Sequence, residues 1–536
     1  MTKNKKSATE SYEEKYDENN VIHYEQSEDV SPFEKLMKIK ESFRFFKNQN
    51  NILYFWCEGS FYEATERQLK ELLRYIFIKK YKQEFKESTL DIIVKSTLTE
   101  QEKYCNTRCD TAYRIYYNKN INEIYYDLGN EQIVRITTNS IAICNKNELL
   151  DVAFLKANNS LDQVIPKIRK ISPEECKRTL FKLSSFINTK NQDELKVLII
   201  YIITTFIQNI SHPILMLCGG PGSSKTTSTK FIRRIIDPSS NEIMAFPNQK
   251  DLELVLGNHY FCAFDNLGDF SIKQDISNLL CCAVTGATIL RRKLYTDNEE
   301  MSLRLKNIII LNGIAPNFDR NDLIERSVII NMNPISQIKR KKDWELENDF
   351  NSLLPDFLNA IFNILSYYLL EKDAYDICGL KRMADFEEAG IIIDLILTDP
   401  EDNEDNENSF ASIYEKIIDK EQEEAIYIDS FVSFVHSYLE EHEIVEGTPT
   451  EVFNKIKSKS YSQCNVHNAN VFVKRLKEKE ALLKQANIFF EVYRGSSRHL
   501  KIYIKHTQKK EKKPEKSNED FTVAFINTVT DEDLEF

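Results

Sequence analysis

The sequence predicts a multidomain α/β protein whose central domain is built on a parallel sheet. The chain has 536 residues, which is too long for one ordinary core and corresponds to about three or four folding units. Between Ser172 and about Leu370, short apolar strands alternate with longer amphipathic helices, as a parallel sheet requires. Gly and Pro are scarce, at 13 each, which favours regular helices and strands.

Charge is distributed unevenly along the chain. The net charge is -12, which argues against a basic coat over the whole protein. Between Glu446 and Lys513, however, 16 Lys and Arg residues stand against 6 Asp and Glu residues, whereas the first 30 residues and the stretch 399–407 are acidic. Basic and acidic residues are therefore concentrated in different parts of the chain.

Membrane insertion and disulfide bonding are not expected. The most apolar run, Leu195 to Ile207, is shorter than the ~20 residues that a membrane span needs, and it predicts a buried helix. The eleven cysteines form no CxxC pair, and the sequence carries no secretory signal. We therefore expect a cytoplasmic protein with free thiols.

Composition and periodicity divide the chain into six segments. Disordered tails are expected at both ends, an acidic one at 1–31 and another at 507–536, because neither has an apolar period. The segments between them are, in order, an α+β domain at 32–170, the central domain with a helical trailing segment at 171–390, an acidic linker at 391–424 and a compact domain at 425–506.

The compact domain at 425–506 has the element order of a winged helix. A helix at Ile428 to Glu441 precedes a second that begins at Thr448 to Glu451, where a capping box has Pro in the first helical position. A third helix, from about Asn468 to Gln485, precedes two strands joined by the turn 494–497. This order predicts a winged helix, which binds either DNA or another protein.

The strongest local signal in the central domain is a glycine loop between an apolar strand, Ile214 to Cys218, and a helix that ends at Ile236. Glycines allow backbone N–H groups to surround phosphate oxygens, Lys225 neutralises the β and γ phosphates, and the Thr226 hydroxyl is a ligand for Mg²⁺. The glycine that usually precedes the lysine is replaced by Ser224. The predicted ATP-binding residues are Gly219, Gly220, Pro221, Gly222, Ser223, Ser224, Lys225, Thr226 and Thr227.

A phosphate loop of this kind requires an acidic residue at the end of a neighbouring strand to hold the magnesium ion. The apolar run from Tyr260 to Phe264 is followed by Asp265, which we predict to be that residue together with Thr226. The next residue is Asn266, which can orient a water molecule but cannot accept its proton. Asp269 is a nearby alternative base.

A predicted β-hairpin follows, with one strand around Ile289 to Tyr295 and a second at Ser302 to Lys306. It carries Arg292, Lys293 and Tyr295, and basic with aromatic side chains suit the phosphates and bases of a single DNA strand. The alternative is a solvated hairpin face without a ligand.

Two polar residues lie next to the last two strands that are predicted in the central domain. Asn312 ends the apolar strand from Asn307 to Leu311, in the position of a sensor for the γ-phosphate. Arg326, just before the strand Ser327 to Met332, is predicted to reach the nucleotide of a neighbouring subunit as an arginine finger. The alternative for Arg326 is an ion pair with Asp322 or Glu325.

These motifs, in this order, resemble the AAA+ motor of replicative helicases carried by phages, plasmids and genomic islands. In particular, the sequence resembles the self-loading, MCM-like helicases of staphylococcal pathogenicity islands and cassette chromosomes, which are related to superfamily III helicases. The resemblance covers roughly 214–340 and, more loosely, the winged helix. It does not extend clearly to the N-terminal domain.

The resemblance implies a hexameric ring that uses ATP and Mg²⁺ to move along one DNA strand, with the hairpin in its central channel. Lys293 matches the basic hairpin position and Arg326 the finger, and the family tolerates the residues found at 224 and 266. The winged helix then recognises the element's own replication origin. Its predicted DNA contacts are Lys474 and Arg475 on the third helix, and Arg494 and Arg498 on the wing.

We therefore hypothesise an ATP-dependent DNA helicase that binds single-stranded and double-stranded DNA. Its predicted catalytic residues are Lys225, Asp265, Asn266, Asn312 and Arg326. Two alternatives stay open: an origin-binding initiator whose ATPase switches assembly without unwinding DNA, and a primase-helicase with its primase in 32–170.

Overall fold

The chain forms two compact units. A computed structural model describes residues 12–16, 22–26, 30–49, 51–148, 152–155, 157, 159–267, 272, 274–292, 300–314, 321–336, 338, 340–398, 408–428, 430–459, 466–494, 498–505 and 523–525. The first unit comprises Met1–Tyr116, Asp127–Ile133 and Ile143–Asn158, and the second comprises Tyr117–Tyr126, Val134–Ala142 and Asn159–Phe536.

The first unit mixes helices with small sheets. Its largest core holds Leu36, Phe55 and Leu69. The helices around this core are α1 (Pro32–Glu41), α2 (Glu66–Tyr81) and α3 (Glu87–Tyr104), and the antiparallel strands are β3 (Arg44–Lys47), β4 (Leu53–Cys57) and β5 (Ser60–Glu63). β6 (Asp110–Ala112) pairs in parallel with β11 (Val152–Phe154). A further sheet has the order β10 (Ile141–Asn145), β9 (Gln132–Ile136), β8 (Glu123–Asp127), β7 (Ile115–Asn118).

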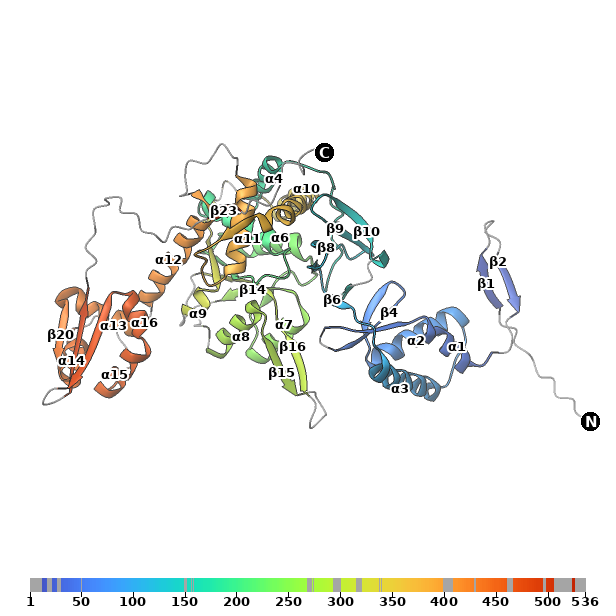
Figure 1. The fold of residues 1–536 in the computed structure, drawn as a ribbon, viewed down its shortest axis with the longest axis horizontal. Coiled ribbons are helices and arrows are strands. Elements are labelled where there is room, and N and C mark those ends of the chain that lie inside the picture. Colours follow the sequence, from blue (N-terminus) through green and yellow to red (C-terminus); the bar gives the residue numbers. More distant parts are fainter. Residues whose placement is uncertain are drawn as a thin grey trace, which may run out of the picture. The chain divides into compact units, whose positions relative to one another are not determined.

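The second unit contains a five-stranded parallel sheet, which confirms the mixed α/β class predicted from the sequence (Figure 1). The strand order is β13 (Met244–Ala245), β14 (Phe261–Leu267), β17 (Ile308–Gly313), β12 (Ile214–Cys218), β18 (Ser327–Asn331). β12 and β17 are buried along their whole length, as expected for a parallel sheet covered on both faces. Because all these strands run the same way, their carboxyl ends lie at one edge.

Helices alternate with the strands of this sheet, and an antiparallel hairpin precedes β17. The helices are α4 (Pro173–Leu180), α5 (Gln192–Thr204), α6 (Lys225–Ile236), α7 (Gln249–Asn258), α8 (Gln274–Thr285) and α9 (Asn321–Ile324). The hairpin pairs β15 (Thr288–Arg292) with β16 (Glu300–Arg304), as the sequence predicts for this region. α5 is the buried helix expected from the apolar run at Leu195, since ten of its residues are buried.

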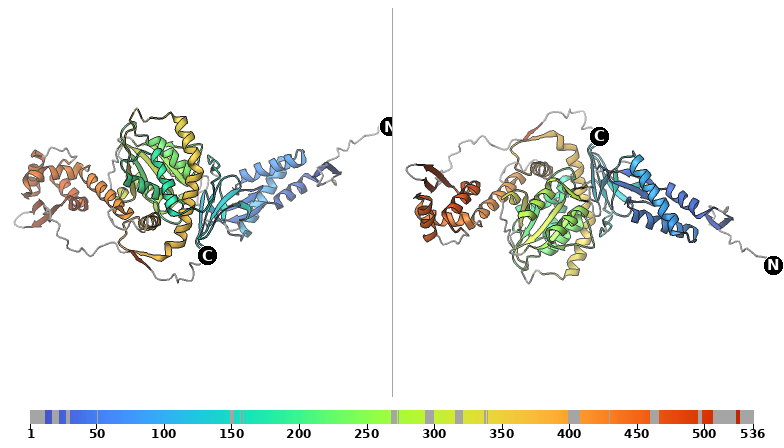
Figure 2. Two further views of the ribbon diagram at one scale, coloured as in Figure 1. Left: turned by 90° about the horizontal axis from the view of Figure 1, so that it is seen from above. Right: turned by 90° about the horizontal axis from the view of Figure 1, so that it is seen from below.

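The longest helix of the second unit, among the described residues, is α10 (Asp343–Glu371), which Figure 2 shows in yellow. By length and composition the stretch Asp343–Ala374 is the one described helix able to cross a membrane. Of its most apolar window, 67% is buried inside the protein, and Phe350, Phe357 and Phe362 are fully buried. This burial is that of a core helix of a globular domain.

The segment 391–424, expected to be an acidic linker, is mostly helical where it is described. α11 (Ala384–Leu397) buries Ile391, Ile392 and Ile393, and α12 (Phe410–Ile428) buries residues at helical spacing, among them Phe410 and Tyr414. The strongly acidic stretch 399–407 lies outside the described residues. The apolar residues on either side of that stretch account for the difference from the expected linker.

Short strands also occur where tails without a fold were expected. Tyr12–Tyr16 (β1) pairs antiparallel with Ile22–Gln26 (β2), and β19 (Tyr375–Ile377) pairs antiparallel with β23 (Val523–Phe525). Both N-terminal segments contain tyrosine or isoleucine, residues that are favoured in strands.

The region 430–504 has its own core, which holds Val435, Phe472 and Leu500. Its elements are α13 (Ser430–His442), β20 (Ile444–Gly447), α14 (Pro449–Lys459), α15 (Ala469–Glu478), α16 (Glu480–Gln485), β21 (Ile488–Arg494) and β22 (Arg498–Ile504). Two details differ from the predicted order: β20 is an additional strand, and the third helix is interrupted at Lys479. Glu478, Lys479 and Glu480 all favour helices, so their propensity could not reveal the interruption.

Candidate nucleotide site and its surroundings

The glycine loop connects β12 to α6 and depends on two glycines for its path. A Cβ atom on Gly219 would lie 2.6 Å from the backbone oxygen of Met332, so no other residue fits there without a shift of the backbone. Gly222 has φ +78°, in the region that favours glycine. The backbone of the loop is thereby held against the chain that follows β18.

Ser224 adopts the left-handed conformation in which a glycine was expected. Its φ is +59° and its ψ is +28°, and the next residue, Lys225, begins α6. A left-handed conformation costs a non-glycine residue about 1–2 kcal/mol. Ser224 thus adopts a conformation that favours glycine, and it does so at this energetic cost.

Ser224→Gly is expected to raise the free energy of unfolding by about 0.5 kcal/mol, because relief of strain exceeds the roughly 0.4–1 kcal/mol that glycine costs through the unfolded chain. Urea denaturation of the full chain measures this change. Ser336→Gly is the matched control, because Ser336 is exposed and is not among the residues with positive φ. A Ser224→Gly variant no more stable than the control would contradict the strain at Ser224.

Lys225 turns its ammonium group back into the loop. Its Nζ donates to the backbone oxygens of Gly219, at 2.6 Å, and Gly220, at 3.1 Å, and to the Ser223 hydroxyl, at 3.3 Å. Ser223 in turn donates to the Gly220 oxygen at 2.8 Å. Among the described residues no carboxylate pairs with Lys225, so its charge is available to an anion bound in the loop.

Thr226, Asp265 and Asn312 form one hydrogen-bonded group at the carboxyl edge of the sheet. The Thr226 hydroxyl donates to Asp265 Oδ2 at 3.0 Å, and Asn312 Nδ2 donates to Asp265 Oδ1 at 3.2 Å. The topology explains their proximity, because β17 lies between β12 and β14 and brings Asn312 beside both. A carboxylate next to a hydroxyl is a donor set that suits Mg²⁺, so the residues present fit a magnesium ion.

The structure does not describe the side chains of the two residues that were predicted to act on the attacking water. Asn266 belongs to β14, but its side chain lies outside what is described, and Asp269 lies outside the described residues altogether. Their predicted roles toward water therefore stay predictions.

Arg326 takes part in a network of two arginines and two carboxylates. Its Nη1 donates to the Asp322 carboxylate and, at 2.9 Å, to the Asp322 backbone oxygen. Arg382, which precedes α11, pairs with the same Asp322 carboxylate at 2.7 Å and with Glu325 at 2.6 Å. The ion pair with Asp322, one alternative in the sequence analysis, is thus formed within the chain.

The two arginines of this network differ in exposure. The side chain of Arg326 is 14% exposed, whereas that of Arg382 is 44% exposed. Partial burial raises the pKa of Asp322, but the hydrogen bond and charge of Arg326, with the charge of Arg382, outweigh it and hold that pKa below its usual value. Asp322 therefore remains a carboxylate at neutral pH.

Arg340 is a basic residue beside the glycine loop that was not predicted from the sequence. One of its guanidinium nitrogens lies 2.7 Å from the point where a Cβ atom of Gly222 would be, and the residue is exposed. Nearby, the Ile335 N–H donates to the Gly222 oxygen at 3.1 Å. In the sequence, only the basic run Arg340-Lys341-Lys342, which follows β18, indicated that a cation could lie beside the loop.

The side chains of five of the seven predicted DNA-contact residues lie outside what is described. Arg292 ends β15, and Arg494 pairs in register with Arg498 at the end of the β21–β22 hairpin, but these three side chains lie outside what is described. Lys293 and Tyr295 lie outside the described residues.

The two predicted contacts on α15 are described. The side chain of Lys474 is 77% exposed and lies 3.6 Å from Glu478, whereas Arg475 is partly buried. Lys474 is therefore the freer of the two to contact a partner molecule.

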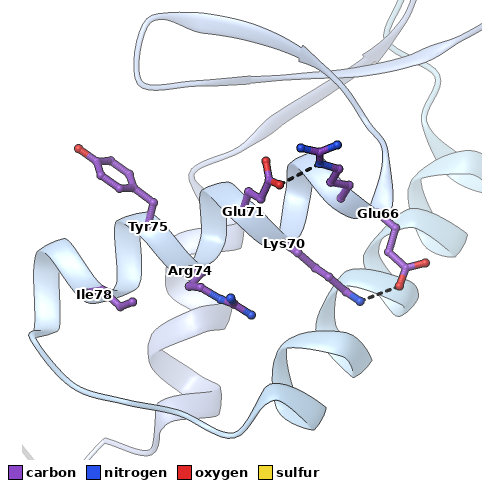
Figure 3. Close-up of a pocket in the computed structure, with 7 residues that line it drawn as sticks. Glu66, Lys70, Glu71, Arg74, Tyr75 and Ile78 are labelled. Carbon is purple, nitrogen blue, oxygen red and sulfur yellow. Dashed lines mark hydrogen bonds and ion pairs between the residues drawn. The ribbon is translucent and has the colours of Figure 1, made fainter.

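A surface cavity of about 590 Å³ lies elsewhere, along one face of α2 in the first unit (Figure 3). Its lining includes none of the predicted site residues. Its three cations are already paired with acids, while Tyr75 is exposed. The pairs are Lys70 with Glu66, Arg67 with Glu71 and Arg74 with Glu87. This cavity therefore offers no free charge for an anionic ligand.

Together, the parallel sheet and the glycine loop at the end of β12 define an α/β domain with a candidate nucleotide site at the carboxyl edge of its sheet. Residues 178–397, less than half of the chain, match the model of a family described as Actinomycete integrative conjugative element replication protein. The match includes the loop and all five strands of the parallel sheet. This part of the chain is thus similar to replication proteins of a class of mobile element.

Comparison with curated proteins gave no match. Among solved structures, one described as SCCmec type IV Cch, active helicase, is 11% identical, with 86% of this chain and 93% of that chain covered at a TM-score of 0.45. The apo A form of the NrS-1 C-terminal region is 11% identical, with 87% and 98% covered at a TM-score of 0.38. JCV helicase with a bound thiazolopyridine compound is 16% identical, with 36% and 54% covered at a TM-score of 0.23. At TM-scores below 0.5, these similarities define neither the fold nor the activity of this chain.

Proposed function

We propose that this chain is an ATP-dependent DNA helicase that starts and drives replication of a mobile genetic element. The observation that carries the proposal is the group formed by Thr226, Asp265 and Asn312 beside the loop that holds Lys225. The family match over 178–397 supports replication of a mobile element as the setting.

In this proposal each residue at the edge of the sheet has one task. Lys225 leaves the loop's own carbonyl oxygens to bind the β and γ phosphates, and the backbone N–H groups of 219–224 surround them. Thr226 and Asp265 hold Mg²⁺, which supplies charge stabilisation of the transferring phosphoryl group when bound. Asn312 senses the γ-phosphate, and Asn266 orients the attacking water. Arg340, beside Gly222, adds a further cation to the phosphates.

The ring is also part of the proposal. A predicted hexamer places Arg326 of one subunit at the nucleotide of the next, which requires Arg326 to leave Asp322 on assembly. Arg382 then remains on Asp322, so the carboxylate is not left without a cation. The network in the single chain is compatible with this exchange, because both arginines already share one acid.

DNA contacts are proposed for two regions of this cytoplasmic protein. The hairpin residues Arg292, Lys293 and Tyr295 grip single-stranded DNA in the channel. The region 430–504 is proposed to be a winged helix that recognises the origin, and its order of helix, strand, two helical regions and hairpin supports this. Within it, the exposed Lys474 contacts DNA, with Arg475 on the same helix and Arg494 and Arg498 on the wing.

Lys293→Ala is expected to weaken binding of single-stranded DNA about tenfold and to abolish stimulation of ATP hydrolysis by DNA, while ATP binding without DNA is retained. DNA binding at a fixed salt concentration and ATP hydrolysis with and without DNA measure these effects. Lys250→Ala removes an exposed lysine from α7 of the same domain and is the control. Equal DNA binding by both variants would contradict the role of the hairpin.

A further inference from the structure

Thr229 and Asn312 are joined by a hydrogen bond that lies wholly inside the second unit. The Thr229 hydroxyl donates to Asn312 Oδ1 at 2.8 Å, and both side chains are fully buried. Thr229 stands on α6 three residues after Thr226 and four after Lys225, so it lies on the face of the helix that also carries them. The helix of the glycine loop is thereby connected directly to the end of β17.

The bonds to Asp265 and Thr229 together fix which way the amide of Asn312 points, because the Asp265 carboxylate can only accept and the Thr229 hydroxyl then donates to Oδ1. An amide has one oxygen that accepts and one nitrogen that donates through two hydrogens. Since Oδ1 accepts from Thr229, Nδ2 must lie on the opposite side, where it donates to Asp265 Oδ1 at 3.2 Å. Rotation of the amide by half a turn would instead bring two oxygens together at Asp265. Only one of the two N–H donors of Asn312 has a described partner, so the second is available on the side of Asp265.

We infer that Thr229 is a positioning residue for ATP hydrolysis, which acts by holding the Asn312 amide with its N–H groups toward the nucleotide. The inference rests on the proposed ATPase and adds a residue to it. Without the Thr229 hydroxyl, the buried Oδ1 loses its donor, and the bond to Asp265 alone holds the amide in place. Nucleotide binding depends on Lys225 and the loop backbone, so it should change little.

The test compares ATP affinity and the rate of ATP hydrolysis in the full chain. Thr229→Val keeps the shape of the side chain and removes the hydroxyl, and we expect it to lower kcat about tenfold with a change in Kd for ATP of no more than about twofold. Thr229→Ser restores the donor and is expected to restore most of kcat. Ser228→Ala is the matched control, because it removes a neighbouring buried hydroxyl on α6 that has no hydrogen-bond partner among the described residues.

A double variant shows whether Thr229 acts through Asn312. If it does, Thr229→Val adds no further loss to Asn312→Ala, whereas independent roles would multiply the two losses. Wild-type kcat in Thr229→Val, an equal loss in Thr229→Ser, or multiplied losses in the double variant would each overturn the inference. If Thr229→Val does not fold, as judged by its thermal unfolding, Thr229→Ala takes its place. Absence of ATP hydrolysis by the wild-type chain would contradict the proposed function itself, and the inference with it.

Discussion

Replacement of Lys225 by alanine is expected to lower ATP hydrolysis at least about 100-fold and to weaken ATP binding strongly. The reason is geometric, because the Lys225 ammonium lies within the loop, on the oxygens of Gly219 and Gly220, and no described carboxylate neutralises it. Removal of a charge that stabilises the transferring phosphate costs about 10²–10³ in rate in comparable sites. Equilibrium binding of a fluorescent ATP analogue and steady-state phosphate release measure the two effects.

The control for Lys225→Ala is Lys250→Ala, which removes the same charge from an exposed position on α7. Thermal unfolding of both variants excludes loss of structure as the cause. Retention of ATP hydrolysis by Lys225→Ala would mean that the loop does not hold the phosphates of the substrate.

Replacement of Arg326 by alanine is expected to reduce ATP hydrolysis about 1,000-fold, in the range known for arginine fingers, with little effect on ATP binding. The change should not destabilise the fold greatly, since Asp322 keeps its contact with Arg382 at 2.7 Å. If Arg326 acts at the nucleotide of the neighbouring subunit, a mixture of two inactive variants should recover some activity. Lys225→Ala and Arg326→Ala subunits are each inactive alone, but a mixed ring contains some sites with an intact Lys225 next to an intact Arg326.

ATP hydrolysis by a mixture of the two variants should therefore exceed that of either alone. Arg382→Ala is the matched control, because Arg382 contacts the same carboxylate and is more exposed. A mixture that recovers nothing would contradict action between subunits. Loss of hydrolysis in Arg382→Ala with full activity in Arg326→Ala would assign the finger to Arg382 instead.

The sequence predicted the parallel sheet and the polar residues that meet at its carboxyl edge, because both depend on local pattern. The buried strands of a parallel sheet appear in the sequence as continuous apolar runs. Polar residues at their carboxyl ends, such as Asp265 and Asn312, must meet at one edge of the sheet. The contacts of Thr229 and Arg340 could not be predicted in the same way. Thr229 has the helical spacing of an ordinary core residue, and the position of Arg340 depends on how the chain after β18 crosses the loop.

The pairing of Arg326 illustrates a second limit. The sequence places Asp322 one helical turn before Arg326, which allowed an ion pair but could not exclude the finger. Arg382, which is distant in sequence, completes the network, and nothing in the local pattern indicated it. Likewise, the interruption of the helix at Lys479 could not be predicted, because the residues around it all favour helices.

The most direct test of the central claim is strand displacement on a forked DNA, with ATP or a non-hydrolysable ATP analogue, at a fixed salt concentration because phosphate contacts are salt-dependent. The proposed helicase predicts that the wild-type chain separates the strands with ATP only, and that Lys225→Ala separates none. ATP hydrolysis without any strand displacement by the wild-type chain would contradict the claim and would favour an initiator whose ATPase switches assembly.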